Sequence, residues 1–214
     1  MKSALRFSEG SHIELEDPIY NSLLKYTKAL SVALGYRDLL TRLHSERVRG
    51  LSEQIGEYCG LPNNEINALN IAASFHDIGK IGIPDHILLK PSKLNEAEWE
   101  AMKRHSEIGE KILASTELEG SRQAALLVRY HHEHFNGAGY PDKLSGENIP
   151  ICSRIISIAD SYDAMAVTRS YNSARTHLEI MDILHEETGS KHDPELMRVF
   201  CEIIESSKFK VAKI

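Results

Sequence analysis

Apolar residues recur three and four positions apart through most of the chain, and long alternating runs rich in Val, Ile and Thr are absent. The first pattern indicates amphipathic helices with one buried face, whereas alternation would indicate strands. We therefore predict an all-α protein. The expected helices cover residues 18–34, 37–60, 61–77, 95–115, 122–135 and 150–167, with two shorter ones near 176–188 and 194–206.

Two stretches interrupt this helical pattern. Residues 78–94, IGKIGIPDHILLKPSKL, contain two glycines and two prolines, and residues 136–141, NGAGYP, contain two glycines and one proline. Because both residue types break helices, both stretches are expected to be loops. The first 35 residues are expected to form a short helical appendage, and residues 36–214 a single domain.

Composition narrows the classes of function. The 214 residues are 42% hydrophobic and 26% charged, with a formal net charge of -6. This mild acidity argues against general binding to nucleic acid polymers or anionic membranes, which requires a basic excess. Cys59, Cys152 and Cys201 are widely spaced and lack CxxC pairing, so neither disulfides nor a thiolate metal site is expected. With no signal-peptide pattern and no apolar run of bilayer length, we expect a cytoplasmic protein.

Histidine is the residue in excess, with 11 in the chain. The histidines and carboxylates of interest fall on different predicted helices or at their ends: His44, His76, Asp77, His105, His131, His132 and Asp160. The helices of a bundle can each contribute one or two such side chains to an internal metal centre. Imidazole nitrogens and carboxylate oxygens suit iron, manganese, zinc and similar cations. Taken singly, a histidine on a helix is more often a hydrogen-bonded core or surface residue than a ligand.

Two short motifs favour the metal centre. HDIGKIGIPD places His76 and Asp77 at a helix end, where the chain can turn back and bring Lys80 to a metal-held phosphate. HHEHFNGAGYP places His131 and His132 directly before a glycine-rich turn. Read alone, this second motif fits a polar helix end that runs into a surface turn equally well.

In their order along the chain, these motifs resemble the HD-GYP family, bacterial phosphodiesterases of cyclic di-GMP within the HD superfamily of metal-dependent phosphohydrolases. HDIGKIGIPD matches the family's HDxGKxxxPD block, and HHEHFNGAGYP its HHExxDGxGYP signature. MKRHSEIG and RIISIADSYDAM match the segments that carry the third histidine and the C-terminal aspartate. The resemblance runs from about residue 38 to residue 175, and it implies a helical HD-domain bundle with a long GYP loop.

Carried over by position, the resemblance implies two divalent metal ions, iron or manganese first, with zinc or nickel as alternatives. The implied ligands are His44, His76, Asp77, His105, His131, His132 and Asp160. Asp77 would bridge the two ions. One ion would be held largely by His44, His76 and Asp160, and the other by His105, His131 and His132. Family members with a third metal carry a glutamate four residues before the first histidine; Leu40 stands there, so a dinuclear site is expected.

The implied reaction uses no protein nucleophile. A hydroxide that bridges the two ions would attack phosphorus, while Lys80, catalytic together with Asp77, would bind a nonbridging phosphate oxygen. The product would be pGpG, or GMP after a second cut. Two alternatives stay open: a hydrolase of another cyclic dinucleotide such as cyclic GMP-AMP, and a non-catalytic module that senses cyclic di-GMP or contacts proteins.

The GYP loop is expected to serve substrate or partners, against the alternative of a plain surface turn. Gly139, Tyr140 and Pro141 would contact substrate, and the Tyr140 ring could stack on a base. The resemblance also implies contact between this loop and GGDEF-type diguanylate cyclases. An upstream receiver or sensor protein and a homodimer are further expected partners. Arg169 lies where the family places an arginine that contacts substrate, although a solvated helix end explains it equally well.

A few further residues complete the prediction. Glu133 and Asp163 are expected to orient ligand imidazoles, and Trp99 is expected in the core. Asn136 replaces the aspartate of the family signature, and Asn172 stands where many members have a basic residue. A lower affinity for cyclic di-GMP or an altered selectivity is therefore expected. The remaining histidines are expected to be surface or packing residues: His12, His86, His134, His177, His185 and His192.

Overall fold

The computed structural model describes residues 32, 35–36, 39–118, 120–167 and 175–211. The prediction of an all-α fold is confirmed, since these residues contain no β-strand and the single bridge between Thr188 and His192 stands alone. The predicted helix 18–34 and most of the expected appendage lie outside the described residues. The division of the chain at residue 35 therefore stays a prediction.

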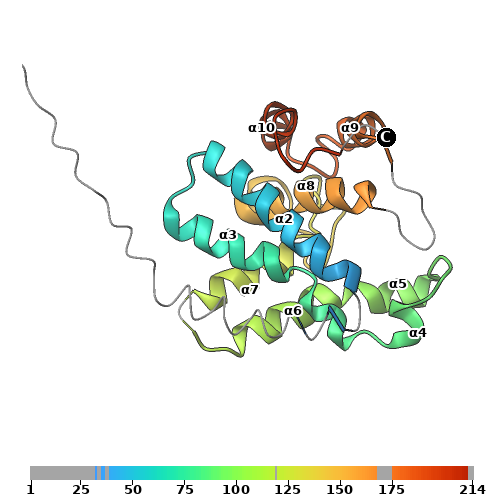
Figure 1. Ribbon diagram of the computed structural model, residues 1–214. Helices are drawn as coiled ribbons and strands as arrows, with labels where there is room; N and C mark the ends of the chain where they lie inside the picture. The colour runs from blue at the N-terminus through green and yellow to red at the C-terminus, as the bar shows by residue number, and fades with distance from the viewer. Residues whose placement is uncertain (1–31, 33–34, 37–38, 119, 168–174, 212–214) are drawn as a thin grey trace, which may run out of the picture.

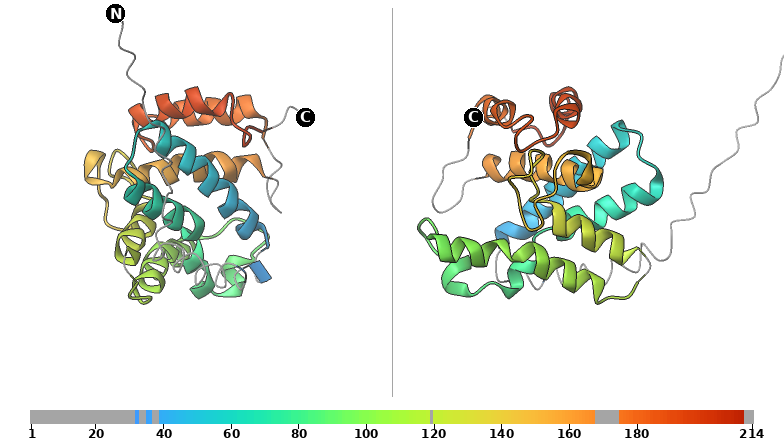
Figure 2. Two further views of the ribbon diagram at one scale, coloured as in Figure 1. Left: turned by 60° about the vertical axis from the view of Figure 1, so that its left-hand side comes forward. Right: turned by 180° about the vertical axis from the view of Figure 1, so that it is seen from behind.

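The described helices, in chain order, are α2 (Leu39–Tyr58), α3 (Asn63–Phe75), α4 (Asp85–Leu88), α5 (Glu96–Lys103), α6 (His105–Ala114), α7 (Ser121–Tyr130), α8 (Ile151–Ala166), α9 (His177–Glu186) and α10 (Pro194–Ile204). Two 3-10 helices, η1 (Ile78–Gly82) and η2 (Gly146–Asn148), lie between them. In Figures 1 and 2, α9 and α10 form one end of the molecule and α4 to α7 the other, with α2, α3 and α8 between them.

Buried hydrophobic residues pack α2 against α8 in the core. Leu51 and Ile55 on α2, Ile155 and Ile158 on α8, and Phe200 on α10 are each at most 1% exposed. Within each helix these residues recur three or four positions apart, so they share one face. Burying each side chain stabilises the fold by about 1.5 to 3 kcal/mol. The same packing fixes the relative position of His44 on α2 and Asp160 on α8.

Three of the predicted elements differ from the structure, and the first two lie between residues 78 and 115. Residues 78–94 are not a simple loop, because they contain η1 and α4. The helix predicted over 95–115 is divided at Arg104 into α5 and α6. At this break the carbonyl of Met102 accepts a hydrogen bond from Nδ1 of His105 at 2.8 Å, and that of Lys103 accepts one from Ser106 Oγ at 3.1 Å. These side chains occupy carbonyls that a continuous helix would use.

The helix predicted over 122–135 also ends early, at Tyr130. Nδ1 of His131 donates to the carbonyl of Val128 at 2.6 Å, and the N–H of Glu133 donates to the carbonyl of Tyr130 at 3.0 Å. Both bonds span three residues instead of four, which tightens and closes the last turn. His131 and His132 therefore leave the helix and turn toward the interior of the bundle.

Gly79 allows η1 to lie directly on α6. A Cβ added at this residue would lie 1.8 Å from the carbonyl oxygen of His105 and 2.6 Å from the backbone nitrogen of Gly109. Since both atoms belong to the backbone, no change of rotamer would relieve the contact. The close approach brings Asp77, which precedes η1, and Lys80, which lies within it, up to His105.

Gly79→Ala is expected to lower the free energy of unfolding by about 3 kcal/mol or more, because the backbone of α6 must move to make room. Gly60→Ala is the matched control. Gly60 has a φ of +70° and no atom within 4 Å of an added Cβ, so only backbone strain of about 1 to 2 kcal/mol is expected there. Urea denaturation of metal-free protein measures both, and equal losses would contradict this role of Gly79.

Candidate metal centre

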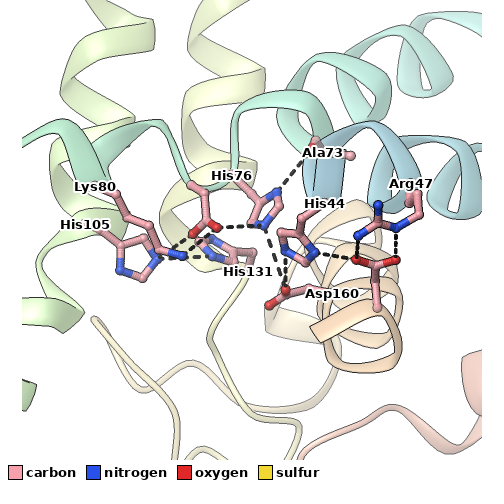
Figure 3. Close-up of polar contacts among 10 residues, drawn as sticks. His44, Arg47, Ala73, His76, Lys80, His105, His131 and Asp160 are labelled. Carbon is pink, nitrogen blue, oxygen red and sulfur yellow. Dashed lines mark hydrogen bonds and ion pairs between the residues drawn. The ribbon is translucent and has the colours of Figure 1, made fainter. Parts of the chain in front are cut away.

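The seven predicted ligand residues come from five separate parts of the chain. Figure 3 shows His44, His76, His105, His131 and Asp160 gathered in the interior of the bundle. His44 lies on α2 and Asp160 on α8, while His76 and Asp77 stand between α3 and η1. His105 opens α6, and His131 and His132 directly follow α7. His44, His76, Asp77, His105 and His131 are each at most 4% exposed.

The side chains form two groups, and within each group the donor atoms lie within 4.8 Å of one another. We call them the His44 cluster, with His44, His76 and Asp77, and the His105 cluster, with His105, His131 and His132. Each group offers three nitrogen or oxygen donors, a set that could hold one metal ion. The clusters match the predicted division of the histidines between two ions.

Asp77 faces both clusters. Its Oδ2 lies 3.5 Å from Nε2 of His76, and its Oδ1 lies 3.7 Å from Nε2 of His105. Asp160 has its ion-pair contacts within 4 Å in the His44 cluster, with Oδ1 at 3.0 Å from Nε2 of His44 and 3.8 Å from Nε2 of His76. Of the two carboxylates, Asp77 has the position from which the two oxygens can each reach a different ion.

Hydrogen bonds at Nδ1 set the tautomers of three histidines. Nδ1 of His76 lies 2.8 Å from the carbonyl oxygen of Ala73, and His105 and His131 make the corresponding contacts with Met102 and Val128 at 2.8 and 2.6 Å. A carbonyl oxygen only accepts, so each Nδ1 carries the proton. Each neutral ring then presents the lone pair of Nε2, the atom available to a metal.

His44 is oriented by a carboxylate. Nδ1 of His44 lies 2.7 Å from Oδ2 of Asp163, which lies one turn beyond Asp160 on α8. Arg47 donates to both oxygens of the same carboxylate, from Nε at 2.6 Å and from Nη2 at 2.9 Å. Sequence reasoning missed Arg47. Its signal was the spacing of three residues from His44, which puts both residues on one face of α2.

The donors fit a metal better than they fit one another. Nε2 of His76 is buried and makes no hydrogen bond. Nε2 of His105 lies only 3.4 Å from Nε2 of His131, so the two lone pairs face each other across a short gap. Buried polar atoms without partners are costly, and facing lone pairs repel unless a cation lies between them. Nitrogen and carboxylate oxygen donors without a thiolate are the set expected for iron, manganese or zinc.

The protonation states of the side chains in the centre suit the binding of cations. Burial lowers the pKa of His131 to about 3, helped by His76 and His105, and burial also lowers the pKa of His105 and of His132. Burial opposes ionisation of Asp77, but Lys80 and the nearby histidines outweigh it and hold the pKa well below its usual range. At neutral pH these imidazoles are neutral and the carboxylate is charged, the states that ligation requires.

His44 differs from the other buried histidines. Burial alone lowers its pKa, but the carboxylates of Asp160 and Asp163 outweigh this and raise the pKa to about 9. In the metal-free protein His44 is therefore protonated at neutral pH. A metal ion bound at Nε2 must displace that proton, so metal affinity at this position is expected to rise with pH.

The GYP loop lies against the His105 cluster. A Cβ added at Gly139 would lie 2.2 Å from the nitrogen of His134 and 2.5 Å from the carbonyl oxygen of His132, so only glycine fits. The N–H of Tyr140 donates to that same carbonyl at 3.2 Å. The ring of Tyr140 is tilted over the ring of His132, with centroids 4.9 Å apart, and Pro141 follows through a cis peptide bond.

Two side chains anchor the loop at Asp142. Arg129 donates from Nε and Nη2 to the two carboxylate oxygens of Asp142 at 2.8 and 2.7 Å, and from Nη1 to Glu110 on α6 at 2.7 Å. Glu133 accepts the N–H of Asp142 at 2.7 Å. The expectation that Glu133 orients an imidazole is thus corrected, because its carboxylate holds loop backbone instead. Arg129 carried no sequence signal apart from its place two residues before His131.

Other predicted residues lie outside this site or outside the part of the chain that the structure describes. Arg169, Asn172 and His12 lie outside the described residues. Oδ1 of Asn136 accepts the N–H of Ala138 at 2.9 Å, a turn contact that the family's aspartate could also make. Trp99 is 46% exposed, so its predicted place in the core is wrong. The other described histidines belong to neither cluster: His86, His134, His177, His185 and His192.

Comparison with known proteins agrees with this geometry. A family model described as "HD domain" matches residues 28–196. The chain belongs to the HD domain family. The HD-GYP resemblance is confirmed by relatives such as the "Cyclic di-GMP phosphodiesterase response regulator RpfG" of Xanthomonas campestris pv. campestris, 40% identical over 77% of this chain and 44% of that protein. A "3'3'-cGAMP-specific phosphodiesterase 2" of Vibrio cholerae is 36% identical over 81% of this chain and 33% of that protein.

Solved structures support the fold. The crystal structure of a cyclic GMP-AMP-specific phosphodiesterase of Vibrio cholerae superposes with a TM-score of 0.65 at 19% identity, covering 89% of this chain and 50% of that one. This HD-domain fold therefore extends over most of the chain.

The chain spans less than half of the length of the two relatives named above. Among the described helices, none has the length and apolar character needed to cross a bilayer.

The stability of the metal-free protein is expected to peak near pH 6.5. Below that value His131 is protonated in the unfolded chain, but its folded-state pKa of about 3 keeps it neutral in the folded protein. Stability therefore falls by on the order of several kcal/mol toward pH 3. Above pH 6.5, the stabilisation from charged His44 is lost as pH rises through its folded pKa of about 9. We call these two losses of stability the acid limb and the alkaline limb of the pH dependence. Urea midpoints measured in the presence of a chelator, from pH 4 to 10, test both.

Two variants separate these limbs. His131→Gln should make the acid limb shallower, with the lowered pKa values of His105 and His132 still contributing to it, and should leave the alkaline limb in place. Asp163→Asn removes one of the two carboxylates that raise the pKa of His44, so it should make the alkaline limb shallower. If either variant kept the wild-type dependence on pH over its own range, the assignment of that limb would be wrong.

Proposed function

We propose that this chain is a metal-dependent phosphodiesterase that hydrolyses cyclic di-GMP to pGpG, GMP or both. The observation that carries the proposal is the position of Asp77, whose two oxygens face two separate donor clusters while Oδ2 lies 2.6 Å from Nζ of Lys80. Two cation sites that share a carboxylate and adjoin a lysine suit the phosphate of a diester. The relatives named as cyclic di-GMP phosphodiesterases favour this substrate.

Two divalent ions would occupy the clusters. His44, His76 and Asp160 would hold one, the His105 cluster would hold the other, and Asp77 would contact both. Iron or manganese is proposed first, with zinc or nickel as alternatives, because all accept imidazole and carboxylate ligands. When bound, such ions lower the pKa of water and neutralise charge on a phosphate.

The chain's own residues position the substrate and balance its charge. Lys80 holds its ammonium at the edge of the centre, with its side chain 17% exposed, and would donate to a nonbridging phosphate oxygen. Asp77 keeps that ammonium in place through their ion pair. Asp163 and Arg47 fix the ring of His44. The carbonyls of Ala73, Met102 and Val128 fix the rings of His76, His105 and His131, respectively.

The outer part of the GYP loop is proposed as the surface for protein partners. Asn136 and Ala138 at its tip are exposed, whereas Gly139 and Tyr140 lie toward the cluster. A loop whose inner side faces the metal centre and whose tip faces solvent could connect a partner to the site. A GGDEF-type diguanylate cyclase is the proposed partner.

A second cyclic dinucleotide is the main alternative. Relatives named as 3'3'-cGAMP-specific phosphodiesterases match the chain at 32 to 36% identity, close to the 33 to 40% of those named for cyclic di-GMP. Asn136 removes a charge from the loop, which favours an altered preference. A non-catalytic role is the less favoured reading, because every donor residue is present.

Asp77→Asn and Lys80→Met are expected to separate metal binding from turnover. Asp77→Asn removes the charge shared by both clusters, so bound metal and cleavage of cyclic di-GMP should fall together by more than tenfold. Lys80→Met keeps all the donors, so metal content should stay and turnover should fall by about 10²- to 10³-fold. Elemental analysis of anaerobically prepared protein, paired with chromatography of the nucleotide products, measures both.

Leu178→Ala is the control, since this side chain is 73% exposed on α9, a helix that carries none of the predicted metal ligands. It should leave metal content and turnover at wild-type values. Full activity of Lys80→Met would refute the role of Lys80. Metal-loaded protein that binds cyclic di-GMP but releases no product over a long incubation would refute the proposed reaction.

Parallel assays with cyclic di-GMP and cyclic GMP-AMP are expected to show the higher kcat/KM for cyclic di-GMP. Asn136→Asp restores the residue of the family signature and should leave metal content unchanged, since Oδ1 can still accept from Ala138. A preference for cyclic GMP-AMP by tenfold or more would favour the alternative substrate.

A further inference from the structure

Trp99 occupies an unexpected place beside the GYP loop. It is the single tryptophan of the chain, and it lies on α5, none of whose residues is buried. Its ring stands nearly perpendicular to that of Tyr140, at an interplanar angle of 84° with centroids 6.3 Å apart. An indole that is 46% exposed is not explained by packing, because tryptophan is usually largely buried.

Tyr140 separates Trp99 from the metal centre. The ring of Tyr140 is tilted by 34° against His132, and Nζ of Lys103 lies 5.6 Å from its centroid. Both neighbours occupy space around the tyrosine ring, which leaves it poorly placed to accept a base. The sequence of rings from His132 through Tyr140 to Trp99 leads outward from the His105 cluster, and the exposed ring is the last one.

The helix that carries Trp99 is held in place at its start. Asn95 and Glu98 form a reciprocal cap at the N-terminus of α5, and Lys90 pairs with Glu98 at 2.5 Å. Lys103, one turn after Trp99, pairs with Glu100 at 2.6 Å and also reaches the ring of Tyr140. Trp99 is thus presented by an ordered helix next to the proposed substrate loop.

We propose that Trp99 is a base-binding residue, on which one purine of the cyclic dinucleotide stacks while a phosphate lies at the metal centre. This inference rests on the proposed function. In a cyclic dinucleotide each phosphate joins two nucleosides, so a base must lie just outside the clusters when a phosphate is held there. Stacking on an indole tolerates every base, since each has a π-face. Trp99 therefore contributes affinity for cyclic di-GMP and for cyclic GMP-AMP alike.

Steady-state kinetics on the metal-loaded full chain test the proposal. Trp99→Ala should raise KM for both cyclic dinucleotides by about 5- to 100-fold, with kcat within about twofold of wild type. Trp99→Phe should recover part of the loss because it restores an aromatic face. Inhibition by inorganic phosphate, which has no base, should stay unchanged in both variants. Leu178→Ala, another exposed apolar residue, should behave as wild type throughout.

The single tryptophan also gives a direct signal. A slowly cleaved phosphorothioate analogue of cyclic di-GMP should quench the fluorescence of the wild type, whereas inorganic phosphate should not. Unchanged fluorescence at saturating analogue would overturn the proposal. An unchanged KM in Trp99→Ala would also overturn it, and the proposed function would stand.

Two further outcomes distinguish the alternatives. If Trp99→Ala weakened inhibition by inorganic phosphate as strongly as it raised KM, Trp99 would be a support for the loop and the base-binding role would be wrong. If the wild type cleaved neither dinucleotide, the proposed function would fail. The fluorescence titration would then still decide the role of Trp99, because quenching requires binding and not cleavage.

Discussion

A hydrogen bond from a histidine ring to a carbonyl three residues earlier occurs at three helix ends, and the metal centre depends on it. His76 makes this bond where α3 ends, His105 where α5 gives way to α6, and His131 where α7 ends. The bond occupies a carbonyl of the last turn, and it fixes the proton on Nδ1. The lone pair of Nε2 must then face the interior. At each of these positions, the same hydrogen bond therefore closes the last turn of the helix and orients the ligand ring.

Charge explains why these rings can remain buried together. Neutral imidazoles avoid mutual repulsion, and the pKa values lowered by burial keep His105, His131 and His132 in that state. Asp77 and Asp160 supply the negative charge, offset in the metal-free protein by Lys80 and by protonated His44. Two cations would take over that compensation. The centre thus combines donors that repel one another weakly with carboxylates that require a positive neighbour.

Sequence patterns predicted the parts of this protein that depend on nearby residues. Helical spacing identified most helices, and HDIGKIGIPD placed His76, Asp77 and Lys80 together because four residues of chain cannot separate them far. Trp99 shows where the approach fails. The spacing of Trp99 and Met102 indicates an apolar helix face but not what covers it. Glu133 was misassigned for a related reason, because its partner Asp142 lies nine residues away across the loop.

By itself, the sequence determined the helical architecture, the breaks at glycine and proline, and, through its resemblance to HD-GYP proteins, the set of donor residues. Only the tertiary structure decided which side chains hold these donors in place, namely Asp163 and Arg47 at the ring of His44, and Arg129 and Glu133 at the GYP loop. The physical reason is distance along the chain. His44 and Asp160 meet because α2 packs on α8, and Asp77 meets His105 because Gly79 lets two backbones touch. No local spacing encodes contacts that are made by the packing of the whole bundle.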